Sequence, residues 1–226
     1  MDPVVSCRLG GGGMKLETIE RTVRWAGAVG ALVSAVAVYS GVVQGAGKAR
    51  AEETENLPGV AQPFLRGSPQ LYLPISLAAL WLLRLLWRPI YRGISAPVRA
   101  VLVAAGSLLY FPGVALMLWG RFTMKDMHNV STDFGAQLYA DHRLVRGGPF
   151  GLMRHPMYAG GIMAELGALL LYRTWATLLI TVNVPLLPIR ARREEKLLAS
   201  HFGAEWEQYA REVPMWPTRI GVRAGD

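Results

Sequence analysis

The sequence predicts an all-α, polytopic membrane protein with about five transmembrane helices, including a short helical hairpin, and a C-terminal amphipathic helix. Of the 226 residues, 52% are hydrophobic and 18% are charged. The hydrophobic residues are gathered into windows that approach the roughly 20 apolar residues needed to cross a bilayer. Lys and Arg number 24 against 16 Asp and Glu, which in a membrane protein indicates loops that face an anionic cytoplasmic leaflet. No basic stripe is interleaved with aromatic residues, so nucleic acid is not an expected partner.

The amino-terminal part is expected to comprise a flexible leader, residues 1–23, and transmembrane helices within residues 24–120. Residues 24–44 are rich in Ala and Val, and their small side chains favour close helix packing. Residues 45–70 are polar and predict a loop, whereas residues 71–87 and 97–120 predict two further spans. The single cysteine, Cys7, excludes an intramolecular disulfide. Met14 is an alternative start to Met1, which would make the leader an extension.

The carboxyl-terminal part, residues 121–226, is expected to hold the functional core. Residues 157–172 form a helix of about 24 Å at 1.5 Å per residue, which is shorter than the roughly 30 Å hydrocarbon core. Residues 175–189 predict an equally short helix, and Arg173 and Thr174 predict the turn between the two. Such a helical hairpin brings the residues after Ile189 back beside the start of its first helix.

The stretch 147–161, GGPFGLMRHPMYAGG, lies where a polar segment becomes an apolar helix. Arg154 and His155 directly precede Pro156, and Pro is favoured at the first position of a helix. A helix N-terminus carries partial positive charge and open N–H donors, which suit an anion. The stretch therefore predicts a cradle for a carboxylate or phosphate. The alternative is that Arg154 and His155 anchor the chain at the membrane interface and the glycines only form turns.

The residues after the hairpin predict an acidic pair on an amphipathic helix, residues 190–211. Glu194 and Glu195 stand among four cationic residues, which is also typical of a solvated helix with surface ion pairs. One helical face is expected to carry residues at every fourth position: Glu194, Leu198, Phe202 and Trp206. The histidines and aspartates of residues 121–150 follow no known metal-ligand spacing, so no metal is expected.

If the hairpin brings these two regions together, one side suits a carboxylate and the other suits an ammonium. Tyr158, one turn into the helix, is placed to present its ring to a second cation. An amino acid that carries a sulfonium, S-adenosylmethionine, has all three groups. Charge alone leaves other amphoteric ligands open.

Two motifs occur in order in this half of the chain. The first reads LV-x-x-GPF-x-x-x-RHP-x-Y-x-G over residues 144–160, and the second reads EE-x-x-L, FG-x-x-W-x-x-Y and VP over residues 194–214. Together they resemble the signature of the isoprenylcysteine carboxyl methyltransferase and phospholipid methyltransferase superfamily, with Trp206 where the family often has Tyr. The resemblance covers roughly residues 121–217 and implies an integral membrane methyltransferase that uses S-adenosyl-L-methionine.

The resemblance also implies site residues. It assigns catalytic positions to Arg121, which would orient a carboxylate acceptor, and to His155. A thiol or amine acceptor needs a base, for which His155 or a Glu is the candidate. The implied cofactor-binding residues are Leu144, Val145, Gly148, Arg154, His155, Tyr158, Gly160, Glu194 and Glu195.

The expected partners are a lipophilic or small-molecule methyl acceptor and membrane lipids, without nucleic acid or metal. The expected location is a bacterial inner membrane, crossed several times, with the site on the cytoplasmic side. Two other classes stay open: an NADPH-dependent membrane reductase of the steroid-reductase type, and a non-enzymatic membrane protein.

Overall fold

A computed structural model describes residues 11–45, 69–91, 93–128, 138 and 140–217, and these residues form helices and no β-strand. The all-α class is therefore confirmed for the described part of the chain. Two of its helices are long and apolar enough to cross a membrane, over Lys15–Gly41 and Ala96–Met127. The expectation of about five spans is not confirmed.

Helix α1 (Gly11–Gly45) begins earlier than the predicted first span, within the stretch expected to be a leader. Its first turns contain charged residues that find partners on other helices. The carboxylate of Glu20 lies 2.8 Å from Arg24 and also contacts Arg99 and Arg173. The predicted loop, residues 45–70, lies almost wholly outside the described residues.

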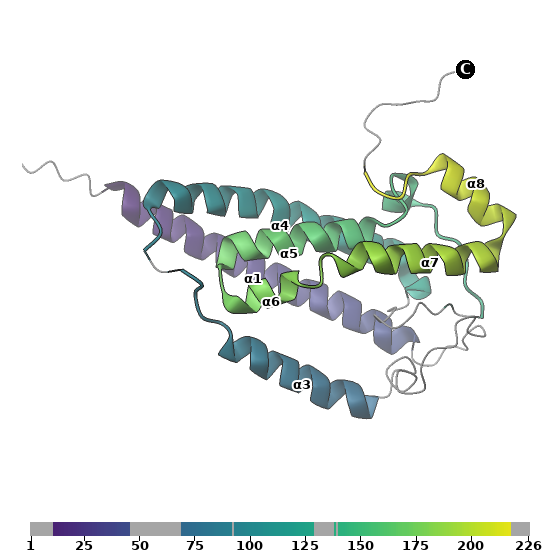
Figure 1. The fold of residues 1–226 in the computed structure, drawn as a ribbon, viewed down its shortest axis with the longest axis horizontal. Coiled ribbons are helices and arrows are strands. Elements are labelled where there is room, and N and C mark those ends of the chain that lie inside the picture. The colour runs from purple at the N-terminus through teal and green to yellow at the C-terminus, as the bar shows by residue number, and fades with distance from the viewer. Residues whose placement is uncertain (1–10, 46–68, 92, 129–137, 139, 218–226) are drawn as a thin grey trace, which may run out of the picture.

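The centre of the fold is the contact between α4 (Ala96–Met124) and α5 (Pro156–Tyr172). Glycines let the two backbones meet: a Cβ on Gly160 would lie 2.6 Å from the carbonyl oxygen of Gly113. Helix α1 lies along the same pair (Figure 1), and the hydroxyl of Tyr110 donates to the Gly27 carbonyl at 2.7 Å. Small residues let helices pack closely by van der Waals contact, which matters in a membrane because the hydrophobic effect does not drive helices together there.

Helix α3 (Pro69–Leu85) stands apart from this bundle (Figure 1). The chain that follows α3 is joined to the start of α6 (Trp175–Thr181) by main-chain hydrogen bonds. The N–H of Trp175 donates to the Arg88 carbonyl at 3.1 Å, and that of Ala176 donates to Leu86 at 3.0 Å. The second predicted span is thus a helix, although its side chains are largely exposed.

The predicted hairpin turn is confirmed. Arg173 ends α5 in the left-handed region, at φ 54° and ψ 43°. Thr174 caps α6 through a reciprocal capping box with Thr177. The helix predicted over residues 175–189, however, is wrong in its second half, because α6 ends at Thr181 and a new helix, α7 (Leu186–Phe202), begins after Pro185. Pro185 has no N–H to continue a helix, so the chain turns there and α7 runs back along α5.

The single amphipathic helix predicted over residues 190–211 is also broken. Gly203 has φ +52°, a conformation that glycine adopts without strain, and separates α7 from α8 (Ala204–Glu212). Trp206 therefore does not share a helical face with Glu194. It packs instead with Tyr209 and Val213, against Leu198 and Phe202 of α7.

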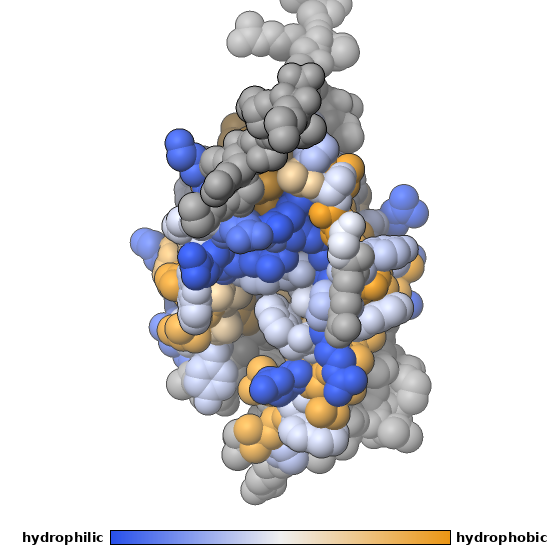
Figure 2. Space-filling view, turned by 90° about the vertical axis from the view of Figure 1, so that its left-hand side faces the viewer, coloured by the Kyte–Doolittle hydropathy of each residue, from blue (hydrophilic) through white to orange (hydrophobic). Residues whose placement is uncertain are grey.

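An ionic cluster fastens the end of the bundle where α1 and α4 begin and α5 ends. Glu20 is 4% exposed and is shared by Arg24, Arg99 and Arg173, which come from three helices or their ends. Figure 2 looks onto this end and shows hydrophilic side chains gathered across its centre. Because one buried carboxylate pairs with three guanidinium groups, its loss leaves like charges facing one another.

We therefore expect Glu20→Gln to lower the free energy of unfolding by about 3 kcal/mol, the scale for removing one partner of a buried ion pair. Thermal unfolding in detergent measures the effect. The control is Glu17→Gln, because Glu17 is 66% exposed and lies 3.6 Å from Arg99; it should cost less than about 0.5 kcal/mol. Equal losses in both variants would contradict the assigned role of Glu20.

Candidate functional site

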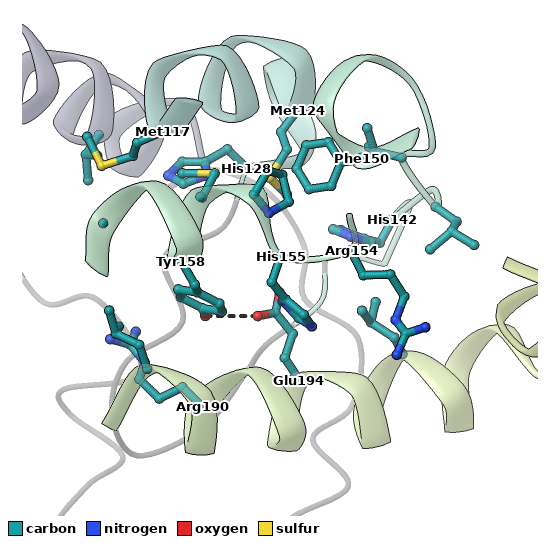
Figure 3. Close-up of a pocket in the computed structure, with 18 of the residues that line it drawn as sticks. Met117, Met124, His128, His142, Phe150, Arg154, His155, Tyr158, Arg190 and Glu194 are labelled. Carbon is teal, nitrogen blue, oxygen red and sulfur yellow. Dashed lines mark hydrogen bonds between the residues drawn. The ribbon is translucent and has the colours of Figure 1, made fainter. Parts of the chain in front are cut away.

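A cavity of about 430 Å³ surrounds the amino-terminal end of α5. One wall comes from α7, and the other comes from the ends of α1 and α4 (Figure 3). Six of the predicted site residues line it: Leu144, Val145, Arg154, His155, Tyr158 and Glu194. The hairpin therefore brings the Arg-His-Pro stretch and the acidic pair to the same place, as the length of its helices predicts.

The contact between Tyr158 and Glu194 joins the start of α5 to the wall formed by α7. The Tyr158 hydroxyl donates to Glu194 Oε2 at 2.9 Å (Figure 3). The ring of Tyr158 also stacks on that of His155, with centroids 5.5 Å apart and planes inclined by 21°. The guanidinium of Arg190 lies 5.8 Å from the Tyr158 ring centroid. A carboxylate and two aromatic rings thus meet at the start of α5.

Arg154 ties the start of α5 to the C-terminal segment. Its Nε donates to Glu195 Oε1 at 2.7 Å, and its Nη1 donates to the carbonyls of Ala210 and Val213 at 2.8 and 2.7 Å. Its main-chain N–H donates to Pro214 at 2.9 Å. These bonds use most of the N–H donors of the guanidinium. The main role of Arg154 is therefore that of a clamp, which joins the start of α5 to α7 and to the C-terminal segment.

Glu195 is the acidic partner of this clamp. Its Oε1 also lies 3.2 Å from Nε2 of His155. Burial alone would raise the pKa of Glu195, but the hydrogen bonds from His155 and Arg154 outweigh it and hold the pKa below the ordinary value. Glu195 does not line the cavity, whereas Glu194 does. The predicted acidic pair is therefore divided into one residue that faces the cavity and one that orders its wall.

Three other predicted residues lie outside the lining. Gly160 packs on Gly113, as described above, and Gly148 adopts φ +57° in a 3-10 turn against Thr123. Arg121 is 4% exposed and donates to α1, through Nε to the Ala37 carbonyl at 2.8 Å and through Nη2 to Ser40 Oγ at 3.3 Å. Its predicted contact with an acceptor would need these bonds to change.

His128, which the motifs do not include, lines the cavity beside Met117 and Met124 (Figure 3). It is 6% exposed. Burial and the nearby charge of Arg121 lower the pKa of His128 to about 4, so this imidazole is neutral at pH 7. The imidazole therefore adds no charge to the cavity wall beside Met117 and Met124.

The floor of the cavity is aromatic. Phe150, Trp206 and Tyr209 line it, and the Tyr209 hydroxyl donates to the Phe150 carbonyl at 2.7 Å. Burial raises the pKa of Tyr209 to about 12, so the phenol stays a donor. The guanidinium of Arg154 lies 5.8 Å from the Trp206 ring centroid.

The motifs also missed Glu165, Asn183 and Arg190, which line the wall between α5 and α7. The one available signal was Glu165, the sole charged residue of the otherwise apolar α5. An ionisable residue in such a helix marks a functional position by default.

The described residues form a helical protein with two membrane-length helices and a cavity at the start of the short helix α5. Residues 101–205 match the family described as "Phospholipid methyltransferase". The predicted resemblance to the isoprenylcysteine carboxyl methyltransferase and phospholipid methyltransferase superfamily is thereby confirmed, and the curated relatives below support it.

Two similar proteins are named "Protein-S-isoprenylcysteine O-methyltransferase". The one from Schizosaccharomyces pombe is 37% identical over 76 residues, which are 33% of this chain and 32% of that protein. The one from Saccharomyces cerevisiae is 32% identical over 108 residues, 45% of each. "Cobalt-zinc-cadmium resistance protein CzcN" of Cupriavidus metallidurans is 32% identical over 88 residues, 38% of this chain and 40% of that protein. The chain thus spans less than half the length of these relatives.

The clamp predicts a pH-dependent contribution from Glu195. We expect Glu195→Gln to lower the free energy of unfolding at pH 7 by about 2 kcal/mol, the scale for hydrogen bonds to a charged group. Because the pKa of Glu195 is lowered by folding, its contribution is present above the ordinary value of 4.5 and is lost as pH falls through the folded pKa. Thermal unfolding of both proteins from pH 7 to pH 3 tests this. A difference that stays constant over that range would contradict it, and Glu207→Gln, at an exposed position of α8, is the control.

His128 predicts a separate loss of stability on acidification, which begins at a higher pH than that of Glu195. The unfolded chain binds a proton on this residue near the ordinary pKa of 6.5, but the folded chain does so only near 4. Stability should therefore fall as pH decreases from about 6.5 to 4. His128→Asn should flatten the change in unfolding temperature across this window, whereas His201→Gln, at an exposed position of α7, should not. An unchanged slope in His128→Asn would show that another group controls it.

Proposed function

We propose that this chain is an integral membrane methyltransferase that uses S-adenosyl-L-methionine, with the cofactor bound in the cavity at the start of α5. The observation that carries the proposal is the Tyr158–Glu194 contact at 2.9 Å, because it sets a carboxylate opposite the amino-terminal end of a helix. A ligand that bears both an ammonium and a carboxylate matches these two ends. The motif resemblance and the family match support the same choice.

The residues present fit this cofactor. Glu194 would hold the ammonium. His155 and the open N–H groups at the start of α5 suit the carboxylate. The adenine would find an apolar and aromatic surface formed by Leu144, Val145, Phe150, Leu198 and Trp206.

When bound, the cofactor supplies a methyl group on a sulfonium, which an acceptor takes by in-line displacement. Protein groups then contribute mainly by positioning and by excluding water. Tyr158 orients Glu194, and the Arg154–Glu195 pair fixes the ring of His155. Arg121 acts through α1, because its donors hold Ala37 and Ser40 beside Val38, which lines the cavity.

The acceptor side of the proposal is lipophilic. Val38, Met117 and Met124 give the cavity an apolar wall formed by the two membrane-length helices. An acyl or prenyl chain entering from the bilayer would meet this wall. We propose residues 121–226 as the cofactor-binding core, in a multi-pass protein of a bacterial inner membrane with the cavity on the cytoplasmic side.

The test is binding of S-adenosylhomocysteine to the purified protein, followed by tryptophan fluorescence and calorimetry. We expect Glu194→Gln to weaken binding by about 10-fold to 100-fold, as for loss of a charged hydrogen bond, with an unchanged unfolding temperature. Glu205→Gln, on α8 and outside the cavity lining, is the matched control. Binding of NADPH in place of S-adenosylhomocysteine, or equal affinity in Glu194→Gln, would overturn the proposal.

A further inference from the structure

The wall between α5 and α7 carries a second acidic position that the proposed cofactor site does not use. Glu165 is the sole charged residue in the sequence of α5. Its Oε1 accepts from Asn183 Nδ2 at 3.3 Å, while its Oε2 is enclosed and has no hydrogen-bond partner among the described residues. No ion pair joins Glu165 to a cation in the part of the chain that the structure describes. A buried acidic group in this condition is costly unless a ligand compensates it.

Glu165 lies on the same side of α5 as the proposed cofactor site. Tyr158 and Glu165 are seven residues apart, which returns to one helical face, and roughly 10 Å along the axis at 1.5 Å per residue. Gly161 lies between them and also lines the cavity. A Cβ there would meet only Leu187 Cδ1, at 3.9 Å, so the glycine leaves room against α7.

The opposite wall is formed by α7 and the turn before it. From the middle of α7 back to that turn, the residues that line the cavity are Glu194, Arg190, Leu187 and Asn183. The cavity thus has one carboxylate at the start of α5, held by Tyr158, and a second two turns deeper, held by Asn183. The deeper end is the one left for an acceptor if the cofactor occupies the first.

The hydrogen-bonding groups of Glu165 and Asn183 determine which acceptor head group fits this end of the cavity. Asn183 uses one amide N–H on Glu165, and its carbonyl oxygen adds an acceptor beside the acceptor oxygens of the Glu165 carboxylate. A small rotation about the terminal bond of Glu165, which is soft in glutamate, turns a carboxylate oxygen towards a ligand. Such a pair favours a group rich in N–H donors and repels a carboxylate.

We propose that Glu165 and Asn183 recognise the methyl acceptor and select an amine over a carboxylate or a thiol. This inference rests on the proposed methyltransferase function and adds the acceptor class to it. Glu165 is a specificity-determining residue that binds the amine head group, and the acceptor's chain extends over the apolar wall.

The experiment compares acceptors that differ only in their head group: dodecylamine, dodecanethiol and dodecanoic acid. Methyl transfer from labelled S-adenosylmethionine is measured with the full-length protein in detergent, together with the affinity for S-adenosylhomocysteine. We expect dodecylamine to be the best substrate by at least 10-fold in kcat/KM. Glu165→Gln should lower kcat/KM for dodecylamine by about 10-fold to 100-fold, chiefly through KM. Its affinity for S-adenosylhomocysteine should stay within about two-fold of that of the original protein.

A change in selectivity separates recognition from a structural role. Glu165→Gln should narrow the ratio of kcat/KM between dodecylamine and dodecanoic acid, whereas Glu207→Gln, on α8, should leave it unchanged. Gly161→Phe, which fills the space between Tyr158 and Glu165, should abolish methylation of dodecylamine.

The outcomes distinguish this inference from the function on which it rests. Retained S-adenosylhomocysteine binding with equal or better use of dodecanoic acid overturns the amine assignment alone. Retained selectivity in Glu165→Gln overturns the role of Glu165 alone. Failure of the original protein to bind S-adenosylhomocysteine overturns the proposed function, and the inference falls with it.

Discussion

The arrangement of the cavity depends on the pairing of Arg154 with Glu195, whose Nε and Oε1 lie 2.7 Å apart. These residues are far apart in the sequence, and the pair fixes the start of α5 against the middle of α7. Removing two charges from water is costly unless further hydrogen bonds satisfy them. Here the carbonyls of Ala210 and Val213 and the ring of His155 supply those bonds. The clamp therefore also fastens the C-terminal segment over the aromatic floor.

The opposite end of the bundle is fastened by the same kind of interaction on different helices. Glu20 joins α1 to Arg99 and Arg173, while Gly113 and Gly160 let α4 and α5 pack backbone to backbone. With α5 held tightly to α4, its other side is left to α7. Gly161 carries no side chain towards α7, which leaves space within the cavity of about 430 Å³. The cavity therefore depends both on tight packing of α5 against α4 and on open space between α5 and α7.

The sequence could predict what depends on local spacing and helix length. The return of the chain at Arg173, and with it the meeting of residues 154–158 with 194–195, follows from a first helix too short to cross the bilayer and from the turn after it. The breaks at Pro185 and Gly203 were missed because an apolar or amphipathic pattern continues through them. The early start of α1 and the bonds of Arg121 could not be predicted, because their partners are remote: Arg173 for Glu20, and Ala37 for Arg121. A sequence shows which residues are charged but not which of them pair.

The separation of Glu194 from Glu195 follows from helix geometry, since neighbouring residues point about 100° apart. On the proposed function this leaves Glu194, in contact with Tyr158, for the cofactor's ammonium and Glu165, two turns further along α5, for the acceptor. That order suits methyl transfer, because the charge of a sulfonium disappears as the methyl group leaves. A fixed carboxylate beside it would stabilise the ground state more than the transition state and slow the reaction. An aromatic face attracts the same charge more weakly, so the ring of Tyr158 suits the sulfonium better than a further carboxylate beside it would.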